Sequence, residues 1–307
     1  MAERYDIILY YKYTTVADPT AFMFWHKSLC AKLSLKGRVL VAQEGINGTL
    51  EGTPAQIDEY CTRLTSQGDG GGCKFGSFSD IVFKRSEGNG RSFQKLIIKV
   101  RDEIVSAKLG NEDVNPNETT GVHLPPEELR TWYERGEAGK DFHIIDMRNT
   151  YEYKVGHFKG STDAGMRNFR ELKNVVKDFE HLKEKKILTV CTGGVRCEKA
   201  SGYLIKKGFK DVYQLDGGMA TYMQKFPGKD FSGSLYVFDN RITMDTTKER
   251  DVIGKCDYCK TTTEHYVNCI NDECHLHFIC CELCEQEREG KTLCVNNCVG
   301  QTARLSV

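Results

Sequence analysis

The 307-residue chain has no excess of charge of either sign, because 43 lysines and arginines balance 43 aspartates and glutamates. No global field therefore attracts a polyanion, and any nucleic-acid site must be a local patch of basic side chains. The chain also lacks an apolar run of the ~20 residues that a membrane span requires. Its first residues lack the basic and apolar regions of a secretory signal. We therefore expect a cytoplasmic protein with no membrane partner.

Two cofactor signatures are missing as well. The sequence contains no Gly-x-Gly-x-x-Gly fingerprint of a flavin or nicotinamide site and no obvious two-histidine, one-carboxylate pattern for iron. Apolar residues make up 39% of the chain and charged residues 28%, which is typical of a globular protein that buries real cores. The length allows two or three domains.

The first hundred residues predict a small α+β domain. Strands and helices are expected in the order β-α-β-β-α-β, which favours a ferredoxin-like sandwich. Within the third segment, Gly45-Ile46-Asn47-Gly48 is typical of a tight turn between two strands. The segments are residues 5–13, 18–34, 37–53, 53–67 and 93–106.

The middle of the chain predicts a parallel α/β domain, because short apolar strands alternate with helical segments there. From about Gly228 strand signals are few, and the chain then enters a region rich in cysteine. We therefore expect an N-terminal domain (1–108), a polar linker (109–124), a parallel α/β domain (125–227) and a C-terminal extension (228–307).

A glycine-rich loop begins at Cys191, at the carboxyl end of an apolar strand, where helix N-termini present their N–H groups. Two glycines let the loop curl so that its amides face inward, and such a nest beside an arginine favours a thiolate. An inert core cysteine is the alternative, but it would need neither feature. We expect Cys191, Arg196 and Cys197 to be catalytic. The anion- or substrate-binding loop would comprise Thr192, Gly193, Gly194 and Val195.

Three motifs resemble those of rhodanese domains. Residues 191–197 match the active-site pattern Cys-x-x-Gly-x-Arg-Ser, with Cys197 in the serine position. Residues 144–161 resemble the second signature and residues 215–222 the third. The resemblance implies a rhodanese-like fold in which Cys191 is the nucleophile and is able to carry a persulfide. It also implies structural roles for Asp146 and Arg148, and a turn position, not general-base catalysis, for His157.

Sequence segments outside this domain point to one particular family of rhodanese-domain proteins. The chain resembles the rhodanese-domain tRNA uridine(34) hydroxylases, and the likeness covers essentially its whole length. Two strings carry it: Val-Ala-Gln-Glu-Gly-Ile-Asn-Gly-Thr-Leu-Glu-Gly-Thr (41–53) and Gly-Ser-Leu-Tyr-Val-Phe-Asp-Asn-Arg-Ile-Thr (233–243). It implies oxygen-dependent conversion of the wobble uridine of tRNA to 5-hydroxyuridine. The anticodon region of tRNA would be the partner, molecular oxygen the co-substrate, and the N-terminal domain acylphosphatase-like.

The C-terminal extension holds four pairs of closely spaced cysteines within residues 254–300. Each pair can supply two thiolates from one turn, which is what tetrahedral zinc demands. We expect two structural zinc ions, bound either as a cross-brace (pairs one and three, pairs two and four) or by consecutive pairs. Free or redox-active thiols are the alternative, and His265, His275 or His277 could replace a cysteine. The expected ligands are Cys256, Cys259, Cys269, Cys274, Cys281, Cys284, Cys294 and Cys298.

The residues alone leave three functions open. A poised cysteine favours a persulfide-forming sulfurtransferase, the family resemblance favours the hydroxylase, and the tail is compatible with a non-catalytic zinc-bearing RNA or protein adaptor. We follow the resemblance for the substrate. A phosphate-facing patch, or else a solvated face, is expected from Lys84, Arg85, Arg91, Lys95 and Lys99. The sequence leaves the oligomeric state open.

Overall fold

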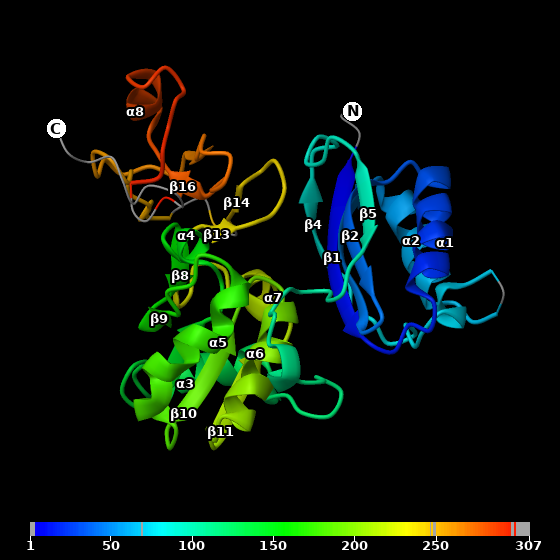
Figure 1. Cartoon of the computed structure of the whole chain (residues 1–307), viewed down its shortest axis with the longest axis horizontal. Coiled ribbons are helices and arrows are strands. Elements are labelled where there is room, and N and C mark those ends of the chain that lie inside the picture. Colours follow the sequence, from blue (N-terminus) through cyan, green and yellow to red (C-terminus); the bar gives the residue numbers. More distant parts are fainter. Residues whose placement is uncertain (1–3, 69, 246, 248–249, 296–297, 299–307) are drawn as a thin grey trace.

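The N-terminal part of the chain is a five-stranded sheet with two helices on one face (Figure 1). The computed structural model describes residues 4–68, 70–245, 247, 250–295 and 298. The elements of this part are β1 (Tyr5–Tyr13), α1 (Pro19–Lys32), β2 (Lys36–Ala42), β3 (Gly45–Gly52), α2 (Pro54–Thr65), η1 (Gly72–Lys74), β4 (Lys84–Gly88) and β5 (Leu96–Val100).

The strand order β4-β1-β3-β2 confirms the predicted ferredoxin-like arrangement, but its last strand is β4 and not the segment expected at 93–106. That segment instead contains β5, which is added parallel to β2 at one edge. The other pairs are antiparallel. Side chains alternate across the sheet because successive residues of a strand point to opposite faces. Ile8 and Tyr10 are buried under α1 and α2, whereas Leu9 and Tyr11 lie on the face that the helices leave open.

The turn between β2 and β3 differs from the sequence prediction. It is formed by residues 43–44, and Asn47-Gly48 lies inside β3. Asn47 Nδ2 donates a hydrogen bond to the carbonyl oxygen of Ile104 at 3.0 Å. A Cβ at Gly48 would lie 2.5 Å from Tyr10 Oη. The Asn-Gly pair therefore serves a tertiary contact and close packing within the sheet.

The middle of the chain forms a second five-stranded sheet, fully parallel, in the order β6-β11-β10-β7-β9. This confirms the predicted parallel α/β fold. After η2 (Gly110–Glu112), its elements are β6 (Val122–Leu124), α3 (Pro126–Arg135), β7 (His143–Asp146), α4 (Thr150–Tyr153), β8 (Gly156–Phe158), β9 (Ser161–Asp163), η3 (Phe169–Glu171), α5 (Leu172–Val175), η4 (Val176–Leu182), β10 (Lys186–Val190), α6 (Val195–Lys206), β11 (Asp211–Leu215) and α7 (Gly218–Lys225).

Helices cover both faces of this second sheet. Ile187 packs on one face with residues of α5 and α6, and its neighbour Leu188 packs on the other with residues of α3 and α7. The edge strand β6 lies inside the segment expected to be a linker (109–124), because its backbone pairs with that of β11. The end of that segment therefore belongs to the sheet.

The C-terminal extension consists of short elements that lie against the second domain (Figure 1). Phe231–Gly233 (β12) pairs with β8. Tyr266 Oη donates to the carbonyl oxygen of Tyr151 at 2.6 Å, and Lys154 forms an ion pair with Asp257 at 2.7 Å. The remaining elements are β13 (Leu235–Tyr236), β14 (Thr243–Met244), β15 (Tyr266–Asn268), β16 (His277–Ile279) and α8 (Glu282–Gln286).

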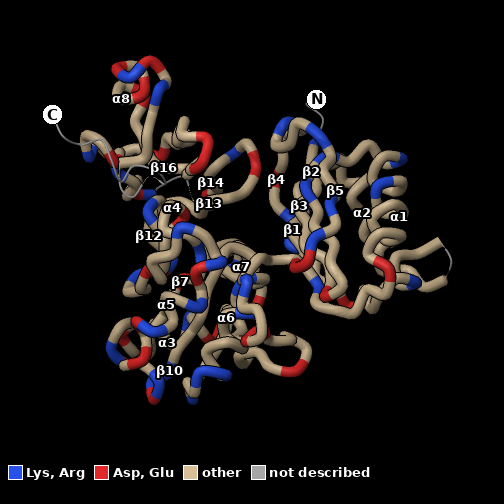
Figure 2. Tube along the Cα trace, in the orientation of Figure 1, with Lys and Arg blue, Asp and Glu red and all other residues tan. Residues whose placement is uncertain are grey.

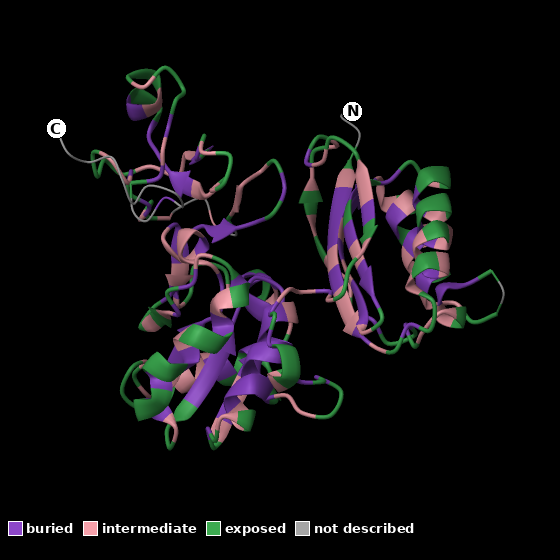
Figure 3. Ribbon diagram, viewed as in Figure 1, coloured by how far each residue is buried: buried purple, intermediate pink, exposed green. Residues whose placement is uncertain are grey.

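Helix α6 joins the two larger parts of the chain. Figure 3 shows much of this helix buried. The Lys199 side chain has no exposed surface, and its Nζ lies 2.9 Å from Glu44, 3.2 Å from Glu103 and 3.1 Å from Asp113. These carboxylates come from the β2–β3 turn, the residues after β5 and the following segment. The buried ammonium thus holds the N-terminal sheet to α6.

Charges of both signs are interspersed over all parts of the molecule (Figure 2), in keeping with the absence of net charge. Among the helices of the described residues, none combines the length and the apolar composition needed to cross a bilayer.

Candidate active site

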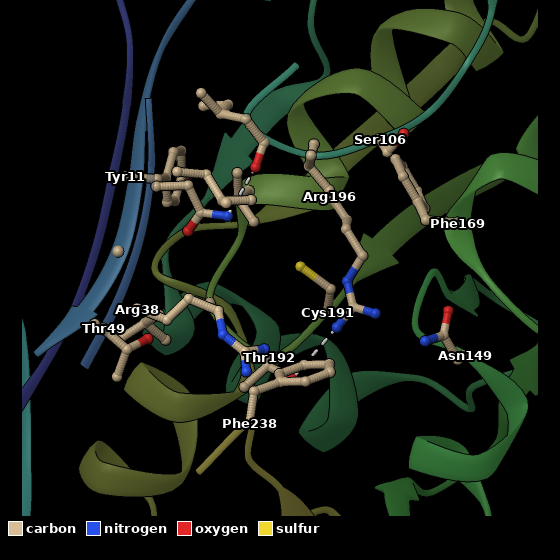
Figure 4. A pocket seen from close by; sticks show the side chains of 18 of the residues that line it. Tyr11, Arg38, Thr49, Ser106, Asn149, Phe169, Cys191, Thr192, Arg196 and Phe238 are labelled. Carbon is tan, nitrogen blue, oxygen red and sulfur yellow. Dashed lines mark hydrogen bonds between the residues drawn. The ribbon is translucent and has the colours of Figure 1, made fainter. Parts of the chain in front are cut away.

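A cavity of about 350 Å³ lies between the open face of the first sheet and the loop that follows β10 (Figure 4). Tyr11 and Arg38 line it from the N-terminal sheet. Cys191 and Phe169 line it from the parallel domain, and Phe238 lines it from the extension. All three parts of the chain therefore contribute to one cavity.

The loop places Cys191 between the end of β10 and the start of α6. Cys191 is buried, and the backbone N–H of Gly194 donates a hydrogen bond to its Sγ at 3.2 Å. Gly194 adopts a φ of +102°, in the region that favours glycine. The predicted curled loop is thus formed, with an amide directed at the sulfur.

The Cys191 thiol is poised as a thiolate. Burial raises its pKa, but the hydrogen bond from the Cys197 thiol, the charge of Arg196 and the backbone amides of both residues outweigh burial and lower the pKa to about 6. The pKa of Cys197 is raised, first by burial and then by its contact with Cys191. At neutral pH one sulfur therefore carries the charge and the other donates the proton of the hydrogen bond.

Arg196 supports the thiolate from a fixed position. Its Nη1 and Nη2 donate to the two carboxylate oxygens of Glu152 at 2.6 and 2.8 Å, and Nη2 also lies 3.5 Å from Thr192 Oγ1. Both side chains of the ion pair are buried. The guanidinium is therefore committed to a protein carboxylate, although its charge still acts on Cys191.

The N-terminal sheet packs directly against the loop. A Cβ at Gly193 would lie 2.6 Å from Leu9 Cδ2, and one at Gly194 would lie 2.8 Å from Tyr11 Oη. Tyr11 Oη donates to Glu198 Oε1 of α6 at 2.9 Å. The two glycines are therefore required by the approach of the other domain as well as by the turn of the loop.

The three residues expected to be structural make internal contacts. Asp146 and Arg148 form a buried ion pair at 2.6 Å, and Arg148 also donates to the carbonyl oxygen of Gly156 at 2.6 Å. His157 stacks on the Tyr153 ring with 3.9 Å between centroids, and its Nδ1 lies 2.9 Å from the carbonyl oxygen of Tyr153. These contacts agree with structural roles.

The expected basic patch is partly used within the chain. Lys84 Nζ lies 4.9 Å from the centroid of the Tyr11 ring, and burial lowers the pKa of Lys84. Arg85 forms ion pairs with Asp58 and Asp6. The cations that line the cavity, besides Arg196, are instead Arg38 and Arg170. No sequence pattern indicated either arginine, although Arg38 shares the open face of β2 with Leu40.

Comparison with known proteins covers nearly the whole chain. Three family models match: "UPF0176 acylphosphatase like domain" at residues 5–104, "Rhodanese-like domain" at 126–225 and "Rhodanase C-terminal" at 232–299. The tRNA uridine(34) hydroxylase of Bacillus licheniformis is 42% identical over 302 residues, 97% of this chain and 89% of the relative. That of Cytophaga hutchinsonii is 40% identical over 287 residues, 93% and 88% of the two chains. The chain belongs to the tRNA uridine(34) hydroxylase family.

Among solved structures, the Alr3790 protein of Anabaena is 24% identical to this family member. The match covers 36% of this chain and 91% of that one, with a TM-score of 0.31.

The tail of this tRNA uridine(34) hydroxylase family member brings its cysteine pairs together in alternation. The first and third pairs, Cys256/Cys259 and Cys281/Cys284, form one cluster, and the second and fourth, Cys269/Cys274 and Cys294/Cys298, form the other. Of the two pairings that the sequence left open, the structure has the cross-brace. Within each cluster the sulfur atoms all lie within 4.8 Å of one another.

Both clusters fit a tetrahedral metal ion. The Sγ–Sγ distances include 3.5 Å for Cys259–Cys281 and 3.6 Å for Cys269–Cys298, which suits zinc–sulfur bonds of about 2.3 Å. Cys280 lies outside both clusters. The two clusters hold no histidine: His265 Nδ1 is 2.7 Å from the Cys280 carbonyl oxygen, and His277 Nδ1 is 2.8 Å from Tyr236 Oη.

Proposed function

We propose that this chain hydroxylates the wobble uridine of tRNA and forms 5-hydroxyuridine, with molecular oxygen as co-substrate. The observation that carries the proposal is the Cys191 thiol, whose pKa is lowered to about 6, beside a cavity that all three parts of the chain line. Relatives 40–42% identical over nearly the full chain are named tRNA uridine(34) hydroxylase. The anticodon region of tRNA is the expected partner, and the cytoplasm, where tRNA is found, the expected place of action.

In the proposed mechanism the Cys191 thiolate adds to C6 of uracil. The new S–C6 bond moves electron density to C5 and O4, so the ring becomes an enolate that reacts with oxygen at C5. Two electrons and two protons from an external reductant convert the second oxygen atom to water. Loss of the C5 proton and departure of the thiolate then restore the ring.

The loop residues have distinct proposed roles. Arg196 and Cys197 keep Cys191 ionised, through charge and through a hydrogen bond. Residues 192–195 would form the anion- or substrate-binding loop; the Gly194 amide donates to Sγ, and the amides of Arg196 and Cys197 also act on the sulfur. Preorganised donors of this kind stabilise negative charge that develops on a substrate.

Sulfur transfer is the second candidate, because the same poised thiolate is suited to carrying a persulfide. In that case the Cys191 thiolate would attack the outer sulfur atom of a sulfane-sulfur donor, displace the rest of the donor as an anion, and pass that sulfur to tRNA or to a small thiol. The third possibility, an RNA or protein adaptor without catalysis, is disfavoured by a thiol whose pKa is lowered to about 6, because an adaptor has no need of a thiolate.

The test is the effect of Cys191→Ser on nucleosides. In cells that lack the gene, wild-type protein should restore 5-hydroxyuridine derivatives in tRNA, and the folded Cys191→Ser variant should not. Loss of thiouridine in the deletion strain would support sulfur transfer, and unchanged nucleosides would support the adaptor. Cys197→Ser is the matched control, and we expect a milder defect because serine also donates a hydrogen bond.

The covalent step has a separate test. A tRNA with 5-fluorouridine at the target position should trap a covalent adduct on Cys191, visible as a slowly migrating band that Cys191→Ser abolishes. An active enzyme that forms no adduct and accumulates a Cys191 persulfide during turnover would exclude addition at C6. Sulfur chemistry would then become the leading mechanism.

For the tail we propose two structural zinc ions, one in each cysteine cluster. The tail has few aliphatic residues, and its core is formed largely by the cysteines themselves. Bound metal would therefore supply much of its stability. We also propose domain limits at residues 108, 125 and 228, with the last residues of the expected linker serving as strand β6.

A further inference from the structure

Phe238 is an apolar side chain that remains half exposed at the wall of the active-site cavity. Its exposed fraction is 50%, whereas most large apolar side chains of the parallel domain are buried. The ring lies over the Arg196 guanidinium, with Cζ 5.7 Å from the ring centroid, and Figure 4 shows it near Thr192 of the loop. An aromatic surface thus borders the cavity that holds the nucleophile.

The exposure of Phe238 does not come from a loose segment. In the residues that follow, Arg241 forms a bidentate ion pair with Asp239, in which Nε donates to Oδ1 at 2.8 Å and Nη2 donates to Oδ2 at 2.7 Å. Arg241 also donates to the carbonyl oxygen of Glu87 at 3.0 Å, and the Asn240 N–H donates to that of Ser92 at 3.0 Å. The ring is therefore held in place by contacts with the N-terminal domain, which lowers the entropy cost of binding a ligand against it.

Arg38 is a cation of the same cavity that has no carboxylate partner in the described part of the chain. It is exposed on β2 and points from the N-terminal sheet into the cavity (Figure 4). Of the other basic groups nearby, Arg196 is engaged by Glu152 and Lys84 by the Tyr11 ring, whereas Arg170 lines the cavity from the parallel domain. In a chain without net charge, an anionic ligand needs such a local cation.

We propose that Phe238 and Arg38 form a nucleotide subsite, in which the ring of Phe238 stacks on the pyrimidine presented to Cys191 and Arg38 binds the adjacent phosphate. This inference rests on the proposed function, because it assumes that the ligand is a single-stranded RNA loop. Stacking on aromatic rings and phosphate contacts to arginine are the interactions by which proteins hold unpaired nucleotides. The subsite gives the extruded base a surface to replace the neighbours that it leaves in the loop.

The stacking half of the inference is tested by binding, without turnover. Fluorescence anisotropy would measure the Kd of the full-length protein for a labelled RNA hairpin whose loop carries one uridine, and for the same hairpin with an abasic site there. We expect Phe238→Ala to raise the Kd for the uridine hairpin on the order of tenfold and to leave the abasic hairpin unchanged. Phe238→Trp should preserve the difference between the two RNAs. The control, Phe24→Ala, removes a phenylalanine that is 63% exposed on α1 and should change neither Kd.

The phosphate half is tested with a neutral methylphosphonate at the linkage next to the uridine. Arg38→Gln should weaken binding of the ordinary hairpin and lower the salt dependence of log Kd by about one ion. It should have no further effect on the methylphosphonate hairpin. Arg135→Gln, which removes an exposed arginine at the end of α3, should leave both properties unchanged.

The outcomes separate this inference from the proposed function. Equal weakening of the uridine and abasic hairpins by Phe238→Ala, or no weakening of either, would overturn the stacking role even if the wild-type enzyme makes 5-hydroxyuridine. If the wild-type protein makes no 5-hydroxyuridine but shows the expected differences between hairpins, the subsite stands and the proposed activity fails. A wild-type protein that does not bind the hairpin would overturn the subsite.

Discussion

Arg196 and Glu152 form a buried, two-pronged ion pair beside Cys191, with N–O distances of 2.6 and 2.8 Å. Glu152 belongs to α4, and its Oε1 also accepts the backbone N–H of Asn149 at 3.0 Å. The arginine of the rhodanese-type loop is therefore held by a helix outside the loop. Its charge is available to Cys191, while its hydrogen-bond donors are largely used.

Removal of Glu152 should destabilise the fold. Glu152→Ala leaves the buried Arg196 without its partner, and we expect the free energy of unfolding in urea to fall by about 3–5 kcal/mol. Glu152→Gln should cost less, because an amide oxygen still accepts one hydrogen bond. The control is Glu59→Gln at the exposed Arg63–Glu59 pair of α2, whose loss should cost no more than about 0.5 kcal/mol. Equal effects at the two sites would show that the buried pair is unimportant.

The charge of Cys191 should follow a titration near pH 6. Its pKa is lowered to about 6, so the thiolate is present above this pH and is lost as the pH falls through it. The rate of Cys191 alkylation by iodoacetamide, measured by mass spectrometry of its peptide, should rise with pH around that midpoint. Cys197→Ala removes a hydrogen-bond donor and should move the midpoint upward, whereas Cys197→Ser should move it less. A midpoint near 9 in the wild-type protein would refute the lowered pKa.

The contact between Gly193 and Leu9 predicts second-site rescue. A methyl group at Gly193 would meet Leu9 Cδ2 at 2.6 Å, so we expect Gly193→Ala to destabilise the protein by about 1–3 kcal/mol through overpacking. In a Leu9→Ala background the same change should cost less, because the colliding group is gone.

Gly194→Ala is the control, because removing the side chain that it would meet should not restore stability. A Cβ there would meet Tyr11 Oη at 2.8 Å, but Gly194 also has a φ of +102°. In a Tyr11→Phe background the backbone strain remains, at about 1–3 kcal/mol. Urea unfolding of the single and double variants measures both couplings, and additive effects for Leu9 and Gly193 would contradict the packing of the sheet on the loop.

Metal content should depend on the clustered cysteines and not on Cys280. Protein prepared without chelators should contain close to two zinc ions per chain, one for each cluster. Cys284→Ser should lose one of them, whereas Cys280→Ser should retain both, because Cys280 is buried but lies outside the clusters. Chelation should expose the tail to proteolysis before the parallel domain. A zinc content of zero with freely titrating thiols would reject the proposal.

Local spacing was sufficient to predict the parts of the molecule that are local in sequence. The Cys191 loop, the helices α1 and α2 and the cysteine pairs each depend on residues a few positions apart, so propensity and spacing reveal them. The Asn-Gly pair at 47–48 was misplaced for the opposite reason. Its contacts are with Tyr10 and Ile104, which no local pattern contains.

The walls of the cavity could not be predicted because they depend on how distant segments meet. Arg38, Phe169 and Phe238 come from three parts of the chain and carry no common signal. The pairing of the cysteine clusters is of the same kind, since both arrangements satisfy the spacing and only the fold of the tail selects one. In the sequence Lys199 is indistinguishable from an ordinary surface lysine of a helix, yet in the structure it is buried among carboxylates.

Lys199 also bears on how the proposed RNA substrate reaches Cys191. Moving the N-terminal sheet away from the loop would separate this ammonium from Glu44 and Glu103, and breaking a buried ion pair costs several kcal/mol. The sheet and the loop are therefore expected to form a narrow cavity whose two walls stay together, and not a cleft that opens by hinge motion. A nucleotide can enter such a cavity only after its base has unstacked from its neighbours in the RNA. Choice among RNA sites then begins with the ease with which each one releases a base.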